Sequence, residues 1–231
     1  MDKIWKLHPI KYSEINNESR KYILFPKLKE IIKKNKPSHI FDYGGGDGSL
    51  EEILNTNYKI GFYDVSKKAV TLAKKKNLSN MTFFNSKSSI PSNKYDLVIF
   101  SLVLMTITSK NTINSTLKEI KRIKKKWGKL IVAITHPCFK IQKFGSFYTD
   151  IQQRDDFNYF SEGGKYLVTL FDPISKRKLK FYDYHWSLSF TVNALIKNNF
   201  RIVEMIELKD MPRGNKYHNK KFPPYLVIIC E

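Results

Sequence analysis

The stretch His39-Ile40-Phe41-Asp42-Tyr43-Gly44-Gly45-Gly46-Asp47-Gly48 decides the fold of this chain. Its apolar first half predicts a short buried β-strand, and its glycines predict a tight turn that lets a ligand approach the backbone closely. The spacing D-x-G-x-G-x-G differs from a dinucleotide fingerprint, because Ser49 stands where that motif needs glycine. The Gly-Lys-Ser/Thr of a phosphate loop is also absent. A glycine-rich connection that binds no ligand is the alternative interpretation.

Strands and helices alternate on both sides of this turn. The expected strands cover 39–43, 58–63, 81–84, 95–104, 130–135, 200–207 and 224–230. One or two helices are expected in 14–35, others at 66–75, 112–125 and 187–197, and a further helix is expected to begin at 50–54. This alternation predicts an α/β fold with a doubly wound, seven-stranded, mostly parallel sheet.

The alternation stops between residues 137 and 186. Two strand-like segments, 166–171 and 178–184, flank the turn-forming residues Asp172-Pro173-Ile174-Ser175, so we expect a β-hairpin inserted after strand five. We interpret 1–231 as a single domain. In this interpretation residues 1–36 form an N-terminal helical cap, and residues 137–186 form a lid over the substrate.

The charge of the chain is strongly positive. Its 231 residues include 41 Lys and Arg against 21 Asp and Glu, which gives a formal net charge of +20. Such an excess favours a polyanionic partner such as RNA. The lysines are spread along the chain, however, and arginine, the better residue for bidentate phosphate contacts, is scarce. We therefore favour solvated lysines and a small-molecule substrate over a nucleic-acid partner.

Other features bound the class of protein. No apolar run approaches the ~20 residues that a membrane helix needs, and the first residues lack a signal-peptide pattern. The two cysteines, Cys138 and Cys230, form neither a disulfide framework nor a metal-binding spacing. These features predict a cytoplasmic protein without a membrane partner or a metal.

Asp64 is the second feature that points to a ligand. It lies twenty residues after Gly44, at the end of the second expected strand. A carboxylate at this place can accept hydrogen bonds from both hydroxyls of an adenosine ribose. The alternative is a helix cap, which is the common role of an Asp at a strand end.

These motifs resemble the class I methyltransferases that use S-adenosylmethionine (SAM), most closely the group called methyltransferase type 11. In that family the D-x-G-x-G-x-G turn surrounds the methionine part of SAM, and a motif similar to Gly61-Phe62-Tyr63-Asp64-Val65-Ser66 contacts the ribose. The family often binds the adenine with an Asp after the third strand, where this chain has Asn85-Ser86-Lys87-Ser88. The resemblance implies SAM as cofactor and a set of cofactor-binding residues: Asp42, Tyr43, Gly44, Gly45, Gly46, Asp64, Val65, Ser86 and Ser101, with Tyr12 and Arg20 closing over them from the cap.

Two histidines are candidate catalytic residues. His136 ends the fifth expected strand, and His185 ends the insertion, so we expect both on the same rim of the cofactor pocket. A histidine suits a general base because its unperturbed pKa is near 6.5. The alternative is that each imidazole holds a loop in place.

The resemblance implies in-line transfer of a methyl group from SAM to an acceptor. A small-molecule acceptor fits the inserted lid. Two alternatives stay open: an RNA or protein methyltransferase that uses the basic surface, and a SAM-binding member without transfer activity.

Overall fold

The computed structural model describes residues 14–15, 17–54, 58–144, 146–172, 174–209 and 221–231. A seven-stranded sheet with the order β3-β2-β1-β4-β5-β10-β9 forms the centre of the molecule. Its neighbours pair in parallel except at β10, which is antiparallel to β5 and to β9. The strands are β1 (His39–Tyr43), β2 (Lys59–Tyr63), β3 (Met81–Phe83), β4 (Tyr95–Ser101), β5 (Lys124–Thr135), β9 (Ile202–Leu208) and β10 (Tyr225–Cys230).

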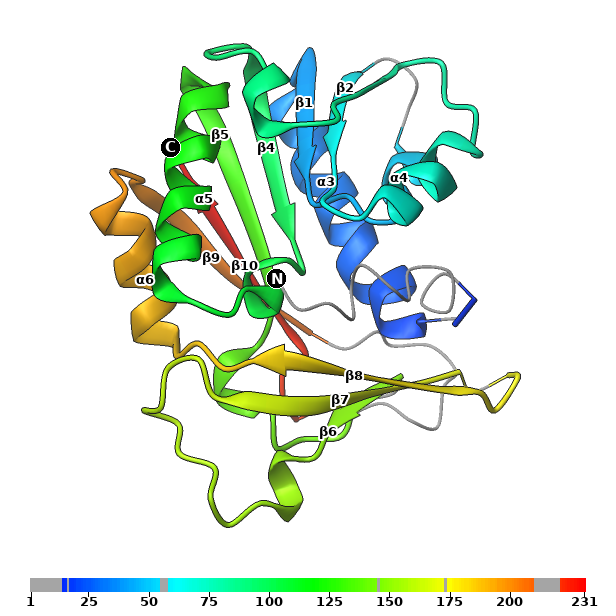
Figure 1. Cartoon of the computed structure of the whole chain (residues 1–231), viewed down its shortest axis with the longest axis vertical. Coiled ribbons are helices and arrows are strands. Elements are labelled where there is room, and N and C mark those ends of the chain that lie inside the picture. Colours follow the sequence, from blue (N-terminus) through cyan, green and yellow to red (C-terminus); the bar gives the residue numbers. More distant parts are fainter. Residues whose placement is uncertain (1–13, 16, 55–57, 145, 173, 210–220) are drawn as a thin grey trace.

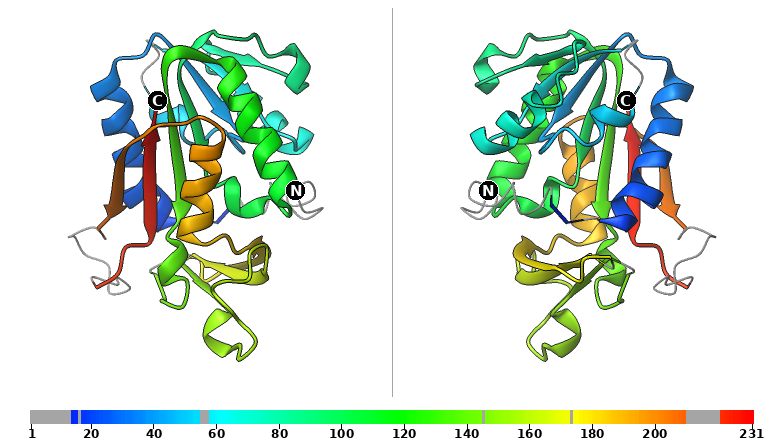
Figure 2. Two further views of the ribbon diagram at one scale, coloured as in Figure 1. Left: turned by 90° about the vertical axis from the view of Figure 1, so that its left-hand side faces the viewer. Right: turned by 90° about the vertical axis from the view of Figure 1, so that its right-hand side faces the viewer.

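Helices cover both faces of this sheet. They are α3 (Phe25–Asn35), α4 (Lys67–Lys74), α5 (Lys110–Ile123) and α6 (Leu188–Lys197). Helix α3 lies on one face, and α5 and α6 lie on the other (Figure 2). The central strands β1 and β4 are therefore covered by apolar side chains from both sides, which explains their nearly continuous burial. The predicted doubly wound α/β fold is confirmed.

The N-terminal helical run contains one irregular turn. A π-helical turn, Arg20–Leu24, leads directly into α3. Pro26 lies in the first turn of α3 and has no N–H to donate to the preceding turn, so the hydrogen-bond ladder widens there. The run ends at Lys36, whose φ of 45° is left-handed, immediately before Pro37.

Two expected elements differ from the structure near the glycine turn. The helix expected to begin at 50–54 is a single 3-10 turn, Glu51–Ile53. Leu54, which follows this turn, has an extended backbone with φ of −82° and ψ of 149°, and it ends the helical conformation there. The fourth strand ends at Ser101 rather than at 104, because Leu102 adopts a left-handed φ of 57° and turns the chain away.

The insertion forms a second sheet. Strands β6 (Phe147–Thr149), β7 (Lys165–Phe171) and β8 (Lys178–Tyr184) pair antiparallel in that order. The expected hairpin is β7–β8, and β6 is an additional strand that the sequence pattern did not indicate. This small sheet lies across the carboxyl ends of the main strands (Figure 1). It thus forms a roof over the edge of the main sheet where ligands bind in open α/β folds.

The roof is joined firmly to the rest of the molecule. Its apolar residues, such as Phe147 and Val168, share a continuous core with α3 and with the main sheet. The hydroxyl of Ser146 lies 2.9 Å from Asn17 Oδ1 and 2.8 Å from Ser19 Oγ, and all three residues are buried. The N-terminal segment and the insertion therefore meet in one buried polar contact. Among the described residues, no helix is long and apolar enough to cross a membrane.

Candidate functional site

A hollow beside the glycine turn lies where the order of strands in the sheet reverses direction. From β1 the chain winds outward through β2 and β3, and then returns to the other side of β1 with β4. Ligands of open α/β sheets bind at the carboxyl ends of two such strands. A cavity of about 840 Å³ opens there, which we call the Gly-turn cavity. Its lining residues are Arg20, Phe25, Asp42, Gly44, Gly45, Gly46, Asp47, Leu50, Asp64, Ser66, Ala69, Ser101, Leu102, Val103 and Thr106.

Two positions of the turn require glycine for different physical reasons. Gly44 has a φ of +88°, and a Cβ there would lie 2.5 Å from the Val103 side chain. Gly46 has a φ of +62° but meets nothing within 4 Å, so its side of the turn faces open space. The left-handed backbone at Gly46 thus leaves room for a ligand instead of for a neighbouring side chain.

Asp64 connects the second strand to the glycine turn. Its Oδ2 accepts a hydrogen bond from the Gly46 N–H at 3.0 Å, and its Oδ1 accepts one from the Ser66 N–H at 2.7 Å. Burial raises the pKa of this carboxyl above its usual range, and the two backbone hydrogen bonds act against that shift. The carboxylate is therefore held in a fixed orientation at the wall of the Gly-turn cavity.

Carboxyl groups gather behind the turn. Asp42, Asp47 and Glu51 are all buried. Burial, together with the neighbouring Glu51 carboxyl, raises the pKa of Asp42 well above its usual range. Burial also raises the pKa of Glu51. The charge of an ionised Glu51 therefore disfavours ionisation of Asp42.

Arg20 places a cationic group at the opposite wall. It comes from the N-terminal helical run and lines the cavity, as the prediction of a closing cap requires. Its Nη2 lies 3.9 Å from Asp47 Oδ2, and its guanidinium carbon lies 5.2 Å from the centroid of the Phe25 ring. The cavity therefore combines an acidic floor with one arginine. Tyr12, the other expected cap residue, lies outside the described residues.

A second cavity of about 720 Å³ borders the first and shares Gly44 and Val103 with it. We call it the Tyr43 cavity; its other lining residues are Tyr43, Tyr63, Val65, Lys87, Ile107, Thr112 and Thr116. The hydroxyl of Tyr43 is buried there without a hydrogen-bond partner among the described residues. Burial raises the pKa of Tyr43, so the hydroxyl stays protonated and can donate.

The remaining expected cofactor residues are divided between these cavities and the surface. Ser101 lines the Gly-turn cavity and Val65 lines the Tyr43 cavity. Ser86 lines neither; its hydroxyl lies on the exposed loop, 3.0 Å from Ser88 Oγ. Lys87, the next residue, lines the Tyr43 cavity instead. Lys87 was not among the expected site residues, because the family resemblance indicated a carboxylate after the third strand.

The structure does not bring His136 to the Gly-turn cavity. It borders a smaller cavity under the roof, with Lys140 and Tyr166. Its Nδ1 accepts a hydrogen bond from the Cys138 N–H at 3.3 Å, and its Nε2 lies 2.8 Å from Glu207 Oε1. Both ring nitrogens are therefore engaged, an arrangement that suits a positioning role better than a free base.

His185 is fully buried inside the insertion and lines none of the cavities described above. Its Nε2 lies 2.7 Å from the Tyr159 carbonyl oxygen and so donates to it, which leaves Nδ1 without a proton. Burial lowers the pKa of this imidazole to about 4. The two histidines thus occupy the roof side of the sheet edge rather than a shared rim of the Gly-turn cavity, and their catalytic role stays a prediction.

The match to a protein family defines the class of this protein. Residues 17–173 match the family described as a methyltransferase domain. This match spans more than half of the chain, so the chain belongs to that family and is a methyltransferase. A comparison with curated protein sequences finds no match.

Solved structures with the same fold include several that are named as SAM-dependent methyltransferases. One from Clostridium acetobutylicum is 14% identical with a TM-score of 0.59, over 97% of this chain and 95% of that chain. A proposed one from Listeria monocytogenes is 22% identical with a TM-score of 0.58, over 87% of this chain and 94% of that chain. DhpI, in a complex with SAM and HEP, is 12% identical with a TM-score of 0.65, over 98% of this chain and 94% of that chain. The class I methyltransferase fold expected from the sequence is confirmed.

Proposed function

We propose that this methyltransferase binds SAM across the Gly-turn and Tyr43 cavities and transfers its methyl group to a small molecule. The observation that carries the proposal is the hydrogen bond between Asp64 and the Gly46 N–H, which joins the two sequence motifs at one cavity wall. A carboxylate fixed beside an open, left-handed glycine is suited to hold the ribose hydroxyls while the backbone turn lies against the rest of the ligand.

The charges of the Gly-turn cavity suit an amino acid that also carries a sulfonium. The methionine part of SAM has one carboxylate and two positive centres. Arg20 would bind the carboxylate, because its guanidinium lines the cavity as a bidentate donor. Asp47 and Asp64 would favour the positive centres, since both carboxyls line the same cavity.

The Tyr43 cavity would take the adenine. Its wall is largely apolar, which suits a flat aromatic ring, and the unpartnered Tyr43 hydroxyl is a donor for a ring nitrogen. Lys87 lines the cavity at the place where related enzymes often have an acidic residue. Gly44 and Val103 lie between the two cavities and would contact the ribose from below.

When bound, SAM supplies an activated methyl group, and this chain supplies alignment and dry surroundings. Ordered side chains that hold two reactants in line can contribute roughly 7–11 kcal/mol of the barrier. The roof formed by β6, β7 and β8 lies across the carboxyl edge of the sheet, where it would keep water from the acceptor (Figure 1).

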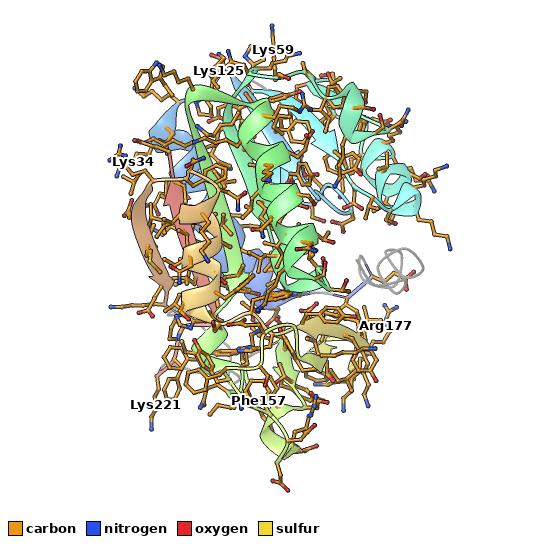
Figure 3. All side chains as sticks on the ribbon, turned by 60° about the vertical axis from the view of Figure 1, so that its left-hand side comes forward. Lys34, Lys59, Lys125, Phe157, Arg177 and Lys221 are labelled. Atoms are coloured by element: carbon orange, nitrogen blue, oxygen red, sulfur yellow. The ribbon has the colours of Figure 1, made fainter. Side chains whose placement is uncertain are left out.

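A small acceptor is favoured over RNA by the distribution of charge. In Figure 3, Lys59 and Lys125 lie together at the top of the molecule and Lys34 at the upper left, whereas Arg177 lies on the right and Lys221 at the lower left. Lys125 is paired with Asp96 at 2.7 Å. Scattered lysines of this kind give solubility and weak, non-specific attraction to polyanions.

Calorimetric titration with S-adenosylhomocysteine, followed by transfer of tritiated methyl from SAM into fractionated cell extract, tests this proposal. We expect saturable binding with one site per chain, and label in the small-molecule fraction. Label confined to RNA or protein would overturn the small-molecule assignment. Binding without transfer to any fraction would leave a cofactor-binding protein without the proposed activity.

A further inference from the structure

A third, narrow cavity that opens partly to solvent lies between the roof and the main sheet, and we call it the roof cavity. Its lining is mostly apolar, which is typical of small-molecule sites. The residues that line it are Asn17, Leu102, Met105, Thr135, Phe147, Val168, Leu170, Phe181, Asp183 and Tyr225. They come from the ends of β4, β5 and β10, from all three strands of the roof, and from the N-terminal segment.

Leu102 lines both this cavity and the Gly-turn cavity. It holds a left-handed φ of 57°, a conformation that costs energy for a branched side chain and is found preferentially at functional sites. Its N–H donates to the Ala133 carbonyl at 2.8 Å, which fixes this strained turn against β5. The two cavities therefore border each other at Leu102, so a molecule in the roof cavity would lie next to one in the Gly-turn cavity.

The roof cavity contains a buried carboxyl group with one oxygen that lacks a hydrogen-bond partner among the described residues. This oxygen is Oδ1 of Asp183, a residue that is 5% exposed. Thr135 Oγ1, at the end of β5, is likewise enclosed in the lining of this cavity and lies beside the Tyr166 side chain. Burying an unpaired carboxyl is costly, and such groups in native structures usually await a ligand or serve in catalysis.

Burial brings the pKa of the Asp183 carboxyl close to neutral pH. The register places it opposite Tyr166 on β7, and the ammonium of Lys140 lies 4.4 Å from the centroid of the Tyr166 ring. Burial raises the pKa of Asp183 to about 7, and the nearby Lys140 acts against that shift. Burial in turn lowers the pKa of Lys140 to about 8. A carboxyl with these neighbours exchanges protons at working pH.

From these observations we infer that the roof cavity is the acceptor site and that Asp183 binds an O–H or N–H of the acceptor and removes its proton. This inference rests on the proposed function and names its substrate class: a small, largely apolar alcohol, phenol or amine. Thr135 would orient the same polar group from the end of β5.

The acceptor oxygen or nitrogen forms a bond to the methyl carbon, the bond between that carbon and sulfur breaks, and its electron pair stays on sulfur. The acceptor proton passes to the ionised carboxylate of Asp183, and leaves to solvent after the product departs. The products are the methylated acceptor and S-adenosylhomocysteine, with no redox partner.

A binding experiment tests the site without relying on turnover. Phenol and toluene have nearly the same shape and differ in one hydroxyl, so their affinities for the protein saturated with S-adenosylhomocysteine are compared by ligand-observed NMR. We expect phenol to bind about tenfold more tightly than toluene, the effect of a hydrogen bond to a charged group. Asp183→Leu should abolish the preference, whereas Asp156→Leu, at an exposed carboxyl of the same insertion, should retain it. Equal binding of the two probes by the wild type would overturn the inference.

A kinetic experiment separates proton removal from binding. Asp183→Asn can still accept a hydrogen bond but cannot take a proton. Using the acceptor found in the extract, or phenol if it is methylated, we expect kcat to fall about 10²–10⁴-fold with KM changed little. The rise of kcat with pH around 7 should disappear in the same variant. An unchanged kcat in a variant that melts at the wild-type temperature would contradict the role of Asp183.

The two proposals fail in different ways. S-adenosylhomocysteine binding is measured for each variant, and Asp183 does not line the Gly-turn or Tyr43 cavities. If the wild type does not bind S-adenosylhomocysteine, the proposed cofactor site is refuted. Normal cofactor binding without phenol preference would refute the acceptor site alone.

Discussion

The carboxylate of Asp64 accepts a hydrogen bond from the backbone N–H of Gly46, with 3.0 Å between Oδ2 and nitrogen. The two residues lie at the ends of neighbouring parallel strands, so this bond joins the turn after β1 to the turn after β2. It also fixes the direction of both carboxylate oxygens, because Oδ1 is held by the Ser66 N–H. Two backbone hydrogen bonds thus fix this wall of the Gly-turn cavity.

Replacing Asp64 by alanine should weaken cofactor binding. The variant loses the proposed contact to the ribose and releases the Gly46 turn, so we expect affinity for S-adenosylhomocysteine to fall by about 1–3 kcal/mol. Calorimetry on the variant measures this change. Asp156→Ala, which removes an exposed carboxyl bonded to Arg154, is the matched control. Wild-type affinity in Asp64→Ala would exclude Asp64 from the site.

The buried pair of Asp42 and Glu51 should make the protein less stable as pH rises. Both folded pKa values are raised above the usual carboxyl range, so the folded state holds protons that the unfolded state has released. The stabilising contribution is therefore full below about pH 4 and is lost as pH rises through the folded pKa values. Glu51→Gln should raise the Tm at pH 7 by several degrees and flatten its dependence on pH.

Glu52→Gln provides the control for this measurement. Glu52 is the neighbouring acidic residue, and it forms an exposed ion pair with Lys76 at 2.6 Å. Exposed pairs contribute little, so its Tm should stay near the wild-type value at every pH. If the two variants show the same pH dependence of Tm, the Asp42 and Glu51 pair is not the source of that dependence.

His185 should make the folded protein less stable as the pH falls below neutrality. Its folded pKa of about 4 lies below the ordinary value of 6.5, so the unfolded state binds a proton first as pH falls. Stability is therefore full above pH 6.5 and declines as pH falls from 6.5 towards 4. His185→Gln, which can retain a donor to the Tyr159 carbonyl, should weaken this decline in a series of melting curves. A decline as steep as in the wild type would assign the acid sensitivity elsewhere.

His136→Asn tests the competing catalytic role. Because both ring nitrogens of His136 have partners, we expect the variant to melt earlier while its turnover per folded molecule changes less than about tenfold. The comparison requires turnover normalised to the folded fraction. A fall of about 10²-fold or more with an unchanged Tm would restore His136 as the general base.

Binding to tRNA should be weak at physiological salt. If the lysines are solvated, we expect a Kd of roughly 0.1 mM or weaker in 150 mM salt, as for non-specific contacts. Fluorescence anisotropy at several salt concentrations measures both the affinity and its salt dependence. Sub-micromolar affinity at 150 mM salt would favour RNA as the methyl acceptor.

The insertion is predicted to cover the acceptor, and hydrogen exchange tests whether it moves. The apolar face of the roof belongs to the main core, so we expect slow exchange in β7 and β8. The segment that precedes β7, residues 153–163, contains no fully buried residue, so we expect it to exchange faster than β7 and β8 unless product and acceptor are bound. Protection of that segment in the free protein, equal to that of β4, would reject a mobile lid.

The sequence alone determined the fold class and the positions of the glycine turn and of Asp64. A buried strand, a glycine turn and a strand-end carboxylate depend on local backbone preferences and on the parallel pairing of successive strands, which sequence patterns record well. Gly44, Gly46 and Asp64 accordingly line one cavity, as expected. The hairpin in the insertion was predicted for the same reason, because its strands are adjacent along the chain.

Only the tertiary structure decided which distant side chains surround the roof cavity. Asp183 and Thr135 come together because the insertion folds back across the carboxyl edge of the sheet. His136 and His185 approach that edge too, but their ring nitrogens bond to Glu207 and to the Tyr159 carbonyl instead of facing the Gly-turn cavity. Side-chain direction and burial at such a junction depend on packing between elements far apart in the sequence, and no local pattern encodes them.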